Sequence, residues 1–307
     1  MRILFMGTPE FAVPSLHILL DHSYEIPAVV TAPDKPRGRG QQVSFTSIKE
    51  FAFRHRIPVL QPERLNDAVF TAEIRRIHPD LIVVVAFRIL PREVYTIPKL
   101  GSFNLHASLL PKYRGAAPIN WALINGEKES GVTTFFLNDN VDTGSLLLQE
   151  RVPIGLDDTA GDLHDSLSVA GAEIVLQTVR LIELGNVQPN LQDDSLACPA
   201  PKIFKKDCRI DWTRPSQQIH NFVRGLSPHP SAWTTHMGKL IKVFRTRIIE
   251  SQSTQAGIVL NRTQNTLEVG TGSGAVSLLE IQQEGKRRLG IEEFLRGYPI
   301  ESGEMFT

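Results

Sequence analysis

The sequence predicts an α/β protein in two parts, a mainly parallel sheet covered by helices and then a small all-β barrel. Short apolar strands alternate with helical stretches in the first part, a pattern typical of parallel sheets. One strand, residues 81–86, contains the continuous run Leu-Ile-Val-Val-Val, which suits burial on both faces. Later in the chain, short strands follow one another between Gly and Asn turns. A length of 307 residues accommodates two such domains.

The elements of the first domain follow from hydrophobic periodicity and from residues that end helices. The expected strands are at residues 2–6, 26–31, 81–86, 103–106, 131–137 and 145–153. The expected helices are at residues 15–21, 47–55, 67–78, 117–125 and 159–184. Gly126 closes the fourth of these helices. Thr159 is a plausible N-cap for the last one, and Gly185 lies just past its end.

The stretch 186–206 changes character, with three prolines, many polar residues and no clear period, which indicates a linker. We therefore predict a catalytic domain over 1–188, a linker over 189–207 and a C-terminal domain over 208–307. The second domain is expected to hold a helix at 215–226. Its expected strands are at residues 231–235, 240–246, 257–261, 266–270 and 275–281.

Composition describes an ordinary globular protein, with 41% hydrophobic residues, 21% charged residues and a net charge of zero. No apolar run is long enough for a membrane span, and neither a signal peptide nor a transit pattern is present, so we expect a cytoplasmic protein. The two cysteines, Cys198 and Cys208, match no metal-binding spacing, and we expect no metal. Residues 205–307 hold 14 Lys and Arg against 10 Asp and Glu, a mild excess that is by itself no sign of nucleic-acid binding.

Two glycine-containing turns are candidate phosphate sites. The turn after the first strand has only Gly7, followed by Pro9, which disfavours dinucleotide binding. Residues 270–274, Gly-Thr-Gly-Ser-Gly, lie between two β segments and lack the Lys-Ser/Thr of a nucleotide loop. A hairpin turn is the favoured interpretation there.

An amide, an imidazole and a carboxylate are the strongest candidates for chemistry. Asn104 and His106 are two apart on a strand and so face the same side, and Asp142 lies in a loop between two strands. The amide can hold an oxyanion, the imidazole can move a proton, and the carboxylate can orient or charge the imidazole. Taken alone, a buried histidine with a satisfied hydrogen bond is the competing interpretation. The end of an interior strand is, however, where open α/β sheets bind ligands.

The segment 33–42 is a basic loop with no apolar anchor, which in an arbitrary protein is most often a solvated loop. The functional alternative is an arm that folds against RNA and contacts its phosphates. The candidate RNA contacts in this arm are Lys35, Arg37, Arg39 and Gln41. Those in the basic second part are Lys205, Lys206, Arg245 and Arg247. The charge run at 286–288 is either a solvated face or a contact to RNA backbone.

Two long motifs resemble the 10-formyltetrahydrofolate-dependent formyltransferases. These are FNLHASLLPKYRGAAPI at residues 103–119 and VDTG at residues 141–144. Residues 5–12, the 34–40 loop, the RIDW at 209–212 and residues 224–233 are similar to the branch that formylates methionyl-tRNA. The likeness covers nearly the whole chain. It departs at Phe87-Arg88, where many members have Tyr-Gly and one more residue before the Leu-Pro.

The resemblance implies a Rossmann-like catalytic domain and a C-terminal barrel similar to OB-folds that binds tRNA. It implies that Asn104, His106 and Asp142 are catalytic and that formyl passes from 10-formyltetrahydrofolate to methionyl initiator tRNA, without a metal. The folate-site residues that it implies are Ser108, Leu109, Leu110 and Pro111, with Phe87, Arg88, Ile89 and Leu90 beside the pteridine. A formyltransferase acting on an amino-sugar nucleotide or another small amine is the alternative. We expect a monomer.

Overall fold

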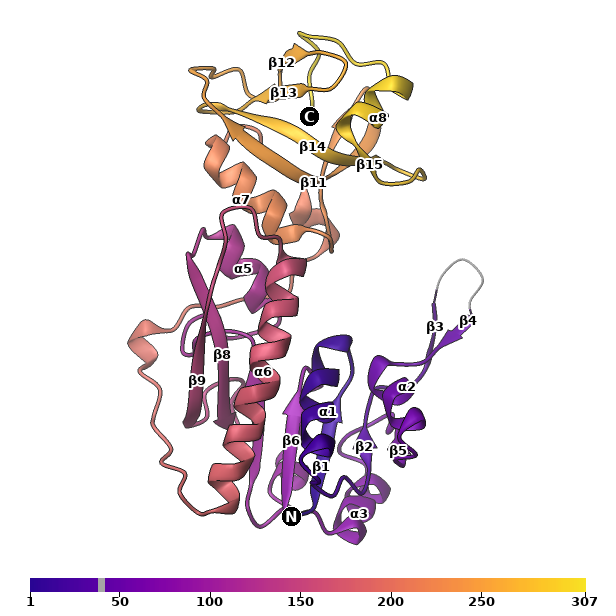
Figure 1. Ribbon diagram of the computed structural model, residues 1–307, viewed down its shortest axis with the longest axis vertical. Helices are drawn as coiled ribbons and strands as arrows, with labels where there is room; N and C mark the ends of the chain where they lie inside the picture. The colour runs from indigo at the N-terminus through magenta and orange to yellow at the C-terminus, as the bar shows by residue number, and fades with distance from the viewer. Residues whose placement is uncertain (38–41) are drawn as a thin grey trace. The chain divides into compact units, whose positions relative to one another are not determined.

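The computed structural model describes residues 1–37 and 42–307 and contains two compact units (Figure 1). Unit 1 consists of Met1–Gly115, Glu129–Pro153 and His164–Pro199, and unit 2 of Ala116–Lys128, Ile154–Leu163 and Ala200–Thr307. The domain limits expected at 188 and 208 stay a prediction. None of the helices in the described part of the chain is both long and apolar enough to cross a membrane.

Unit 1 is built on a seven-stranded sheet. In chain order its strands are β1 (Ile3–Gly7), β2 (Val29–Val30), β5 (Val59–Leu60), β6 (Leu81–Val85), β7 (Ser102–His106), β8 (Glu129–Phe136) and β9 (Leu146–Pro153). Their order across the sheet is β5-β2-β1-β6-β7-β8-β9. The first five are parallel, and β8 and β9 add an antiparallel hairpin at one edge. The predicted mainly parallel sheet is confirmed.

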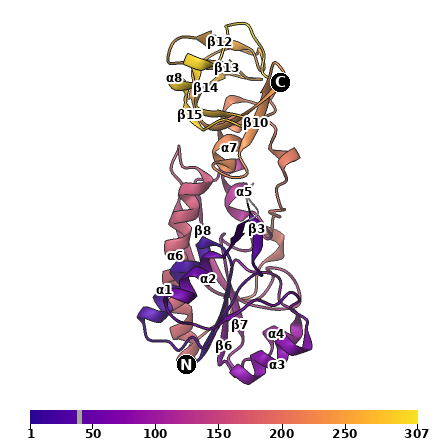
Figure 2. The ribbon, with the colours of Figure 1, turned by 90° about the vertical axis from the view of Figure 1, so that its right-hand side faces the viewer.

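Helices cover both faces of this sheet. They are α1 (Val13–Asp21), α2 (Ser47–Arg54), α3 (Ala68–Ile77), α4 (Arg92–Tyr95) and α6 (Ala160–Glu183), with short 3-10 helices at Glu10–Ala12 and Asp194–Leu196. Figure 2 shows α1, α2 and α6 on one side and α3 and α4 on the other. Every residue of β1 and β6 is buried, as coverage of both faces requires. At the start of α6, the Thr159 N–H donates to Asp162 at 2.9 Å, which satisfies a free amide there.

The carboxyl ends of β1, β6 and β7 lie together at one edge of the sheet, because these neighbouring strands are parallel. From β1 the chain passes to β2 and β5 on one side and returns to β6 on the other. Ligands of open α/β sheets bind outside the carboxyl ends near such a switch point. His106 is the last residue of β7, so the fold places the predicted chemistry at this edge.

The basic segment differs from the loop that we expected. Its flanks form two short antiparallel strands, β3 (Lys35–Arg37) and β4 (Gln42–Ser44), which make a small sheet of their own. Periodicity did not reveal them, because three residues are too few to show an alternation. The predicted tRNA contacts Arg39 and Gln41 fall at 38–41, outside the described residues.

Unit 2 contains an antiparallel sheet of six strands. They are β10 (Ala232–His236), β11 (Lys239–Ile249), β12 (Val259–Arg262), β13 (Leu267–Gly270), β14 (Ala275–Gln283) and β15 (Leu289–Gly290). The order is β10-β11-β14-β13-β12, with β15 beside β14. Phe306 bridges to His236 of β10, and Met305 bridges to Ile258, beside β12. One segment therefore joins both edges, which gives the predicted barrel-like closure.

Three helices complete unit 2: α5 (Pro118–Ile124), α7 (Ser216–Leu226) and α8 (Ile291–Gly297). The apolar face of α7 packs Ile219 and Val223 into the core of the sheet. Its buried Arg224 donates to the carbonyl oxygens of Gly155 and Asp158 at 3.1 and 3.3 Å. A buried guanidinium is stable only with such partners, so α7 also anchors the segment before α6.

We predict that the closure of the barrel depends on Phe306. This side chain is 2% exposed and lies 5.9 Å from Trp212 between ring centroids, whereas its neighbour Met305 is 50% exposed. Phe306→Ala should lower the free energy of unfolding of unit 2 by ~3–5 kcal/mol, because it leaves a cavity. Met305→Ala should change it by no more than ~0.5 kcal/mol. Urea unfolding followed by tryptophan fluorescence measures both, and equal losses would contradict the prediction.

Candidate functional site

Asn104 and His106 lie on one face of β7 at its carboxyl end. Asn104 pairs with Val84 of β6 on one side and with Phe135 of β8 on the other, so its backbone is fixed from both directions. Its side chain is half-buried and makes no hydrogen bond within residues 1–37 and 42–307. An amide donor is therefore available beside the imidazole, as the alternation along the strand predicts.

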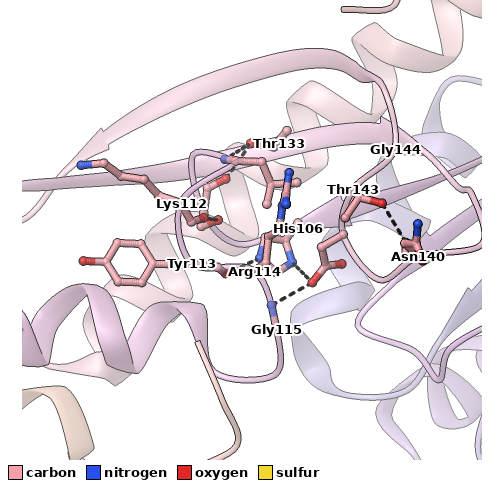
Figure 3. Close-up of polar contacts among 12 residues, drawn as sticks. His106, Lys112, Tyr113, Arg114, Gly115, Thr133, Asn140, Thr143 and Gly144 are labelled. Carbon is pink, nitrogen blue, oxygen red and sulfur yellow. Dashed lines mark hydrogen bonds and ion pairs between the residues drawn. The ribbon is translucent and has the colours of Figure 1, made fainter. Parts of the chain in front are cut away.

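The His106 ring is held by a backbone carbonyl. Its Nε2 lies 2.8 Å from the carbonyl oxygen of Tyr113, and because a carbonyl can only accept, Nε2 carries a proton and donates. Its Nδ1 then faces the Asp142 carboxylate, with Oδ2 at 3.7 Å. A proton on Nδ1 makes the two side chains an ion pair, and both are largely buried. Figure 3 shows His106 between Gly115 on one side and Thr133 on the other.

The loop between β8 and β9 brings Asp142 to the ring. Asp142 has a φ of +56°, a left-handed conformation that aspartate tolerates better than most residues. Its Oδ2 accepts a hydrogen bond from the Gly115 N–H at 2.9 Å, which fixes the carboxylate. The loop folds closely over the end of β8, where a Cβ at Gly144 would come within 1.6 Å of the Phe136 carbonyl oxygen. Only glycine fits at that position.

The loop that follows β7 is held by two polar side chains from the hairpin. Thr133 of β8 lies directly opposite His106, and its hydroxyl donates to the Ser108 carbonyl at 2.6 Å. The same oxygen accepts from the Leu110 N–H at 3.1 Å and from the Gln149 amide at 3.0 Å. Gln149 of β9 also donates to the Leu110 carbonyl at 2.8 Å. Neither Thr133 nor Gln149 is predicted from the sequence, since only the strand register reveals their positions.

The predicted folate residues after β7 differ in exposure. Ser108 is fully buried, and its hydroxyl donates to the Lys112 carbonyl at 2.6 Å, while Leu110 is 3% exposed. These two shape the loop from within. Leu109 and Pro111 are half-buried and present apolar surface beside the site. A Cβ at Gly131 would come within 2.5 Å of the Leu109 side chain, so glycine allows this side chain to lie against β8.

The predicted pteridine segment follows β6. Phe87 and Leu90 pack against the core between the sheet and the α3–α4 face, and Ile89 is exposed. Arg88 donates to the carbonyl oxygens of Pro62 and Glu63 at 2.8 and 3.1 Å. Burial lowers the pKa of its guanidinium. Arg88 therefore fastens the segment to the loop after β5, which leaves Ile89 as its exposed apolar side chain.

A buried lysine anchors the base of the basic arm. Lys49 of α2 forms an ion pair with Asp34, the residue just before β3, and donates to Gln61 at 2.7 Å. Gln61 in turn donates to the other oxygen of Asp34 at 2.8 Å. These hydrogen bonds, first that from Lys49, lower the pKa of the Asp34 carboxyl. The root of the arm is thus fixed, and Lys35 and Arg37 follow it in β3.

The candidate tRNA contacts of unit 2 lie on its surface. Lys205 and Lys206 are exposed residues of a 3-10 helix at Lys205–Cys208. Arg245 and Arg247 are exposed residues on one face of β11, and Arg245 pairs weakly with Glu280 at 3.9 Å. Across the described chain, no three His, Cys, Asp or Glu side chains gather as metal ligands.

The chain matches known families over both parts. Residues 1–179 match the family model for formyl transferase, and residues 202–299 match that for the formyl transferase C-terminal domain. The chain is 47% identical over 305 residues to the methionyl-tRNA formyltransferase of Caldanaerobacter subterraneus, covering 99% of both chains. It is 44% identical over 313 residues to that of Bacteroides thetaiotaomicron, covering 99% of this chain and 97% of the relative.

Solved structures share the fold at lower identity. HypX from Aquifex aeolicus in complex with tetrahydrofolic acid superposes with a TM-score of 0.68 at 21% identity, over 100% of this chain and 50% of that one. WlaRD, a sugar 3N-formyl transferase, gives a TM-score of 0.67 at 21% identity, over 94% and 99%. Both solved structures share the fold of this chain.

We predict that the Thr133 hydroxyl holds the loop at 108–112 in place. Thr133→Val keeps the volume but leaves the buried Leu110 N–H and Ser108 carbonyl without this partner, and it should lower the free energy of unfolding of unit 1 by ~1–3 kcal/mol. Thr133→Ser retains all three hydrogen bonds and should cost about 1 kcal/mol or less. Urea unfolding followed by circular dichroism compares them. A larger loss for Thr133→Ser would contradict the role of the hydroxyl.

Proposed function

The chain belongs to the methionyl-tRNA formyltransferases of the formyltransferase family, and from this membership we propose how its own residues perform the reaction. The reaction is the folate-dependent formylation of the α-amino group of methionyl initiator tRNA. The formyl donor in our proposal is 10-formyltetrahydrofolate. The protein acts in this proposal as a cytoplasmic monomer.

The mechanism assigns one task to each residue of the catalytic trio, Asn104, His106 and Asp142. The neutral α-amine attacks the formyl carbon, and the carbonyl oxygen becomes an oxyanion that accepts hydrogen bonds from the Asn104 amide and from the protonated Nδ1 of His106, since Nε2 donates to the Tyr113 carbonyl. Asp142 charges and orients His106. Together with a water molecule, the Asp142 carboxylate carries a proton from the attacking nitrogen to N10 of the folate. The bond between N10 and the formyl carbon then breaks, which releases tetrahydrofolate and the formylated amine.

One observation carries this assignment. His106 Nδ1 and Asp142 Oδ2 lie 3.7 Å apart, and Gly115 fixes the carboxylate from the other side while Tyr113 fixes the ring. The Asn104 amide, which has no hydrogen-bond partner among the described residues, lies on the same strand face. A donor, a proton carrier and an orienting carboxylate at the carboxyl edge of the sheet meet the needs of acyl transfer to an amine.

The two substrates are proposed to meet at this edge from different surfaces. Exposed Ile89 and half-buried Leu109 and Pro111 supply apolar contacts for the folate, within the segments 87–90 and 108–111. The arm that begins at Asp34 and the exposed basic residues of unit 2 supply contacts for tRNA phosphates. The basic residues in this role are Lys35, Arg37, Arg39, Lys205, Lys206, Arg245 and Arg247, with Gln41 as a neutral contact.

The trio variants test the mechanism. Asn104→Ala and His106→Ala should each lower kcat by ~10²–10³, the usual loss for one oxyanion donor. Asp142→Ala should lower kcat by a similar factor of ~10²–10⁴, because proton transfer fails. Thermal unfolding and formyl transfer under saturating substrates are measured together. A variant that folds and keeps near-normal kcat is excluded from the mechanism.

The substrate assignment is tested with three acceptors: methionyl initiator tRNA, methionyl elongator tRNA and an amino-sugar nucleotide. Only the first should be formylated rapidly. Arg37→Ala and Arg247→Ala should raise the KM for initiator tRNA and flatten its salt dependence, because each removes about one phosphate contact. Their folate KM should not change. Rapid formylation of the sugar nucleotide with no response to tRNA would favour the small-amine alternative.

A further inference from the structure

A polar stretch at residues 190–198, which the sequence presents as part of a linker, lies against both loops of the site. Asn190 exchanges two backbone hydrogen bonds with Leu146, at 2.7 and 2.9 Å, just after the Asp142 loop. At its other end, the Cys198 carbonyl accepts from the Arg114 N–H at 3.0 Å, just before Gly115. This stretch therefore connects the loop that carries Asp142 with the loop that holds His106.

We propose that Gln192, in the middle of this stretch, is a positioning residue that keeps the Asp142 carboxylate beside His106. The inference rests on the proposed role of Asp142 in formyl transfer. The Gln192 amide nitrogen donates to the carbonyl oxygens of Asp142 and Gly144, both at 2.9 Å. Gln192 thus fixes the backbone of Asp142 from one side while Gly115 holds its carboxylate from the other.

The contacts of Gln192 determine which way its amide points. The nitrogen faces two carbonyl oxygens, which only accept, and the oxygen faces the Arg114 guanidinium, which only donates, at 2.7 and 3.1 Å. If the amide were flipped, its oxygen would face the two carbonyl oxygens and its nitrogen would face the guanidinium, so none of the four hydrogen bonds could form. Gln192 is half-buried, so these hydrogen bonds are partly shielded from water.

Gln192 is the one side chain of this stretch that spans both loops through a shielded contact. Arg114 also forms an ion pair with Asp194 at 2.7 Å, but the Asp194 side chain is 81% exposed, so that pair contributes little. Through Arg114, the glutamine is linked to Tyr113 and Gly115, the two backbone contacts of the His106–Asp142 pair. Loss of the Gln192 amide should therefore move the carboxylate and not the substrates.

The kinetic test uses Gln192→Ala and Gln192→Glu, with Gln188→Ala as the matched control. Gln188 is an exposed glutamine just before this stretch, with no hydrogen bond to its side chain among the described residues. Gln192→Glu retains a partner for Arg114 but places oxygen atoms against the two carbonyls. Both Gln192 variants should lower kcat about 10- to 100-fold with KM values for tRNA and folate within about twofold of wild type, because the reacting groups are misplaced. Gln188→Ala should match wild type.

A double-mutant cycle separates positioning from general damage to the structure. If Gln192 acts through Asp142, then Gln192→Ala should cause no further loss of kcat in an Asp142→Ala background, measured in single turnovers with excess enzyme. Losses that multiply, or KM values that rise in step with the fall in kcat, would overturn the proposal. So would Gln192→Glu with wild-type kcat.

Amide hydrogen exchange tests the positional claim without reference to activity. The Gly115 N–H, which donates to Asp142, should exchange faster in both Gln192 variants than in wild type and Gln188→Ala. Unchanged exchange would overturn the proposal even if kcat falls. A wild-type protein that fails to formylate methionyl-tRNA would instead overturn the proposed function, and the exchange result would then stand as a structural finding.

Discussion

The site depends on holding a carboxylate next to an imidazole where little water reaches either group. The side chains of His106 and Asp142 are only 7% and 13% exposed. Withdrawing such groups from water is unfavourable unless fixed dipoles of the protein take the place of the water. The Gly115 N–H supplies one dipole to the carboxylate, and the Tyr113 carbonyl supplies one to the ring. Tyr113 takes up a φ of +60° in doing so, a conformation that costs roughly 1–2 kcal/mol and that the surrounding contacts must offset.

The antiparallel hairpin at the edge of the sheet is what completes this arrangement. The parallel strands bring Asn104 and His106 to the carboxyl edge, where many ligands bind in such folds. They supply no carboxylate there. β8 and β9 add the Asp142 loop, and their register also places Thr133 opposite His106 and Gln149 within reach of Leu110. One supersecondary element thus delivers a reactive group and the hydrogen bonds that shape the neighbouring loop.

Irregular segments contribute to the site as much as strands do. Residues 190–198 have no period, which correctly indicates the absence of a long helix or strand, apart from the short 3-10 turn at Asp194–Leu196. Lack of period says nothing about where such a backbone lies. Its polar side chains find partners on two loops, because unpaired donors and acceptors near the core are unfavourable. The same holds at the base of the basic arm, where Lys49 and Gln61 donate hydrogen bonds to the Asp34 carboxylate.

Local sequence patterns were sufficient to predict much of the fold and part of the site. The period of two placed Asn104 and His106 on one face, apolar runs located the buried strands, and long motifs carried the family resemblance. Tertiary structure decided the partners: Asp142 meets Gly115 across 27 residues and Gln192 across 50, and β3 pairs with β4. The physical reason is that periodicity reports which face a residue presents, whereas hydrogen bonds between distant segments depend on strand register and loop path, which no local pattern encodes.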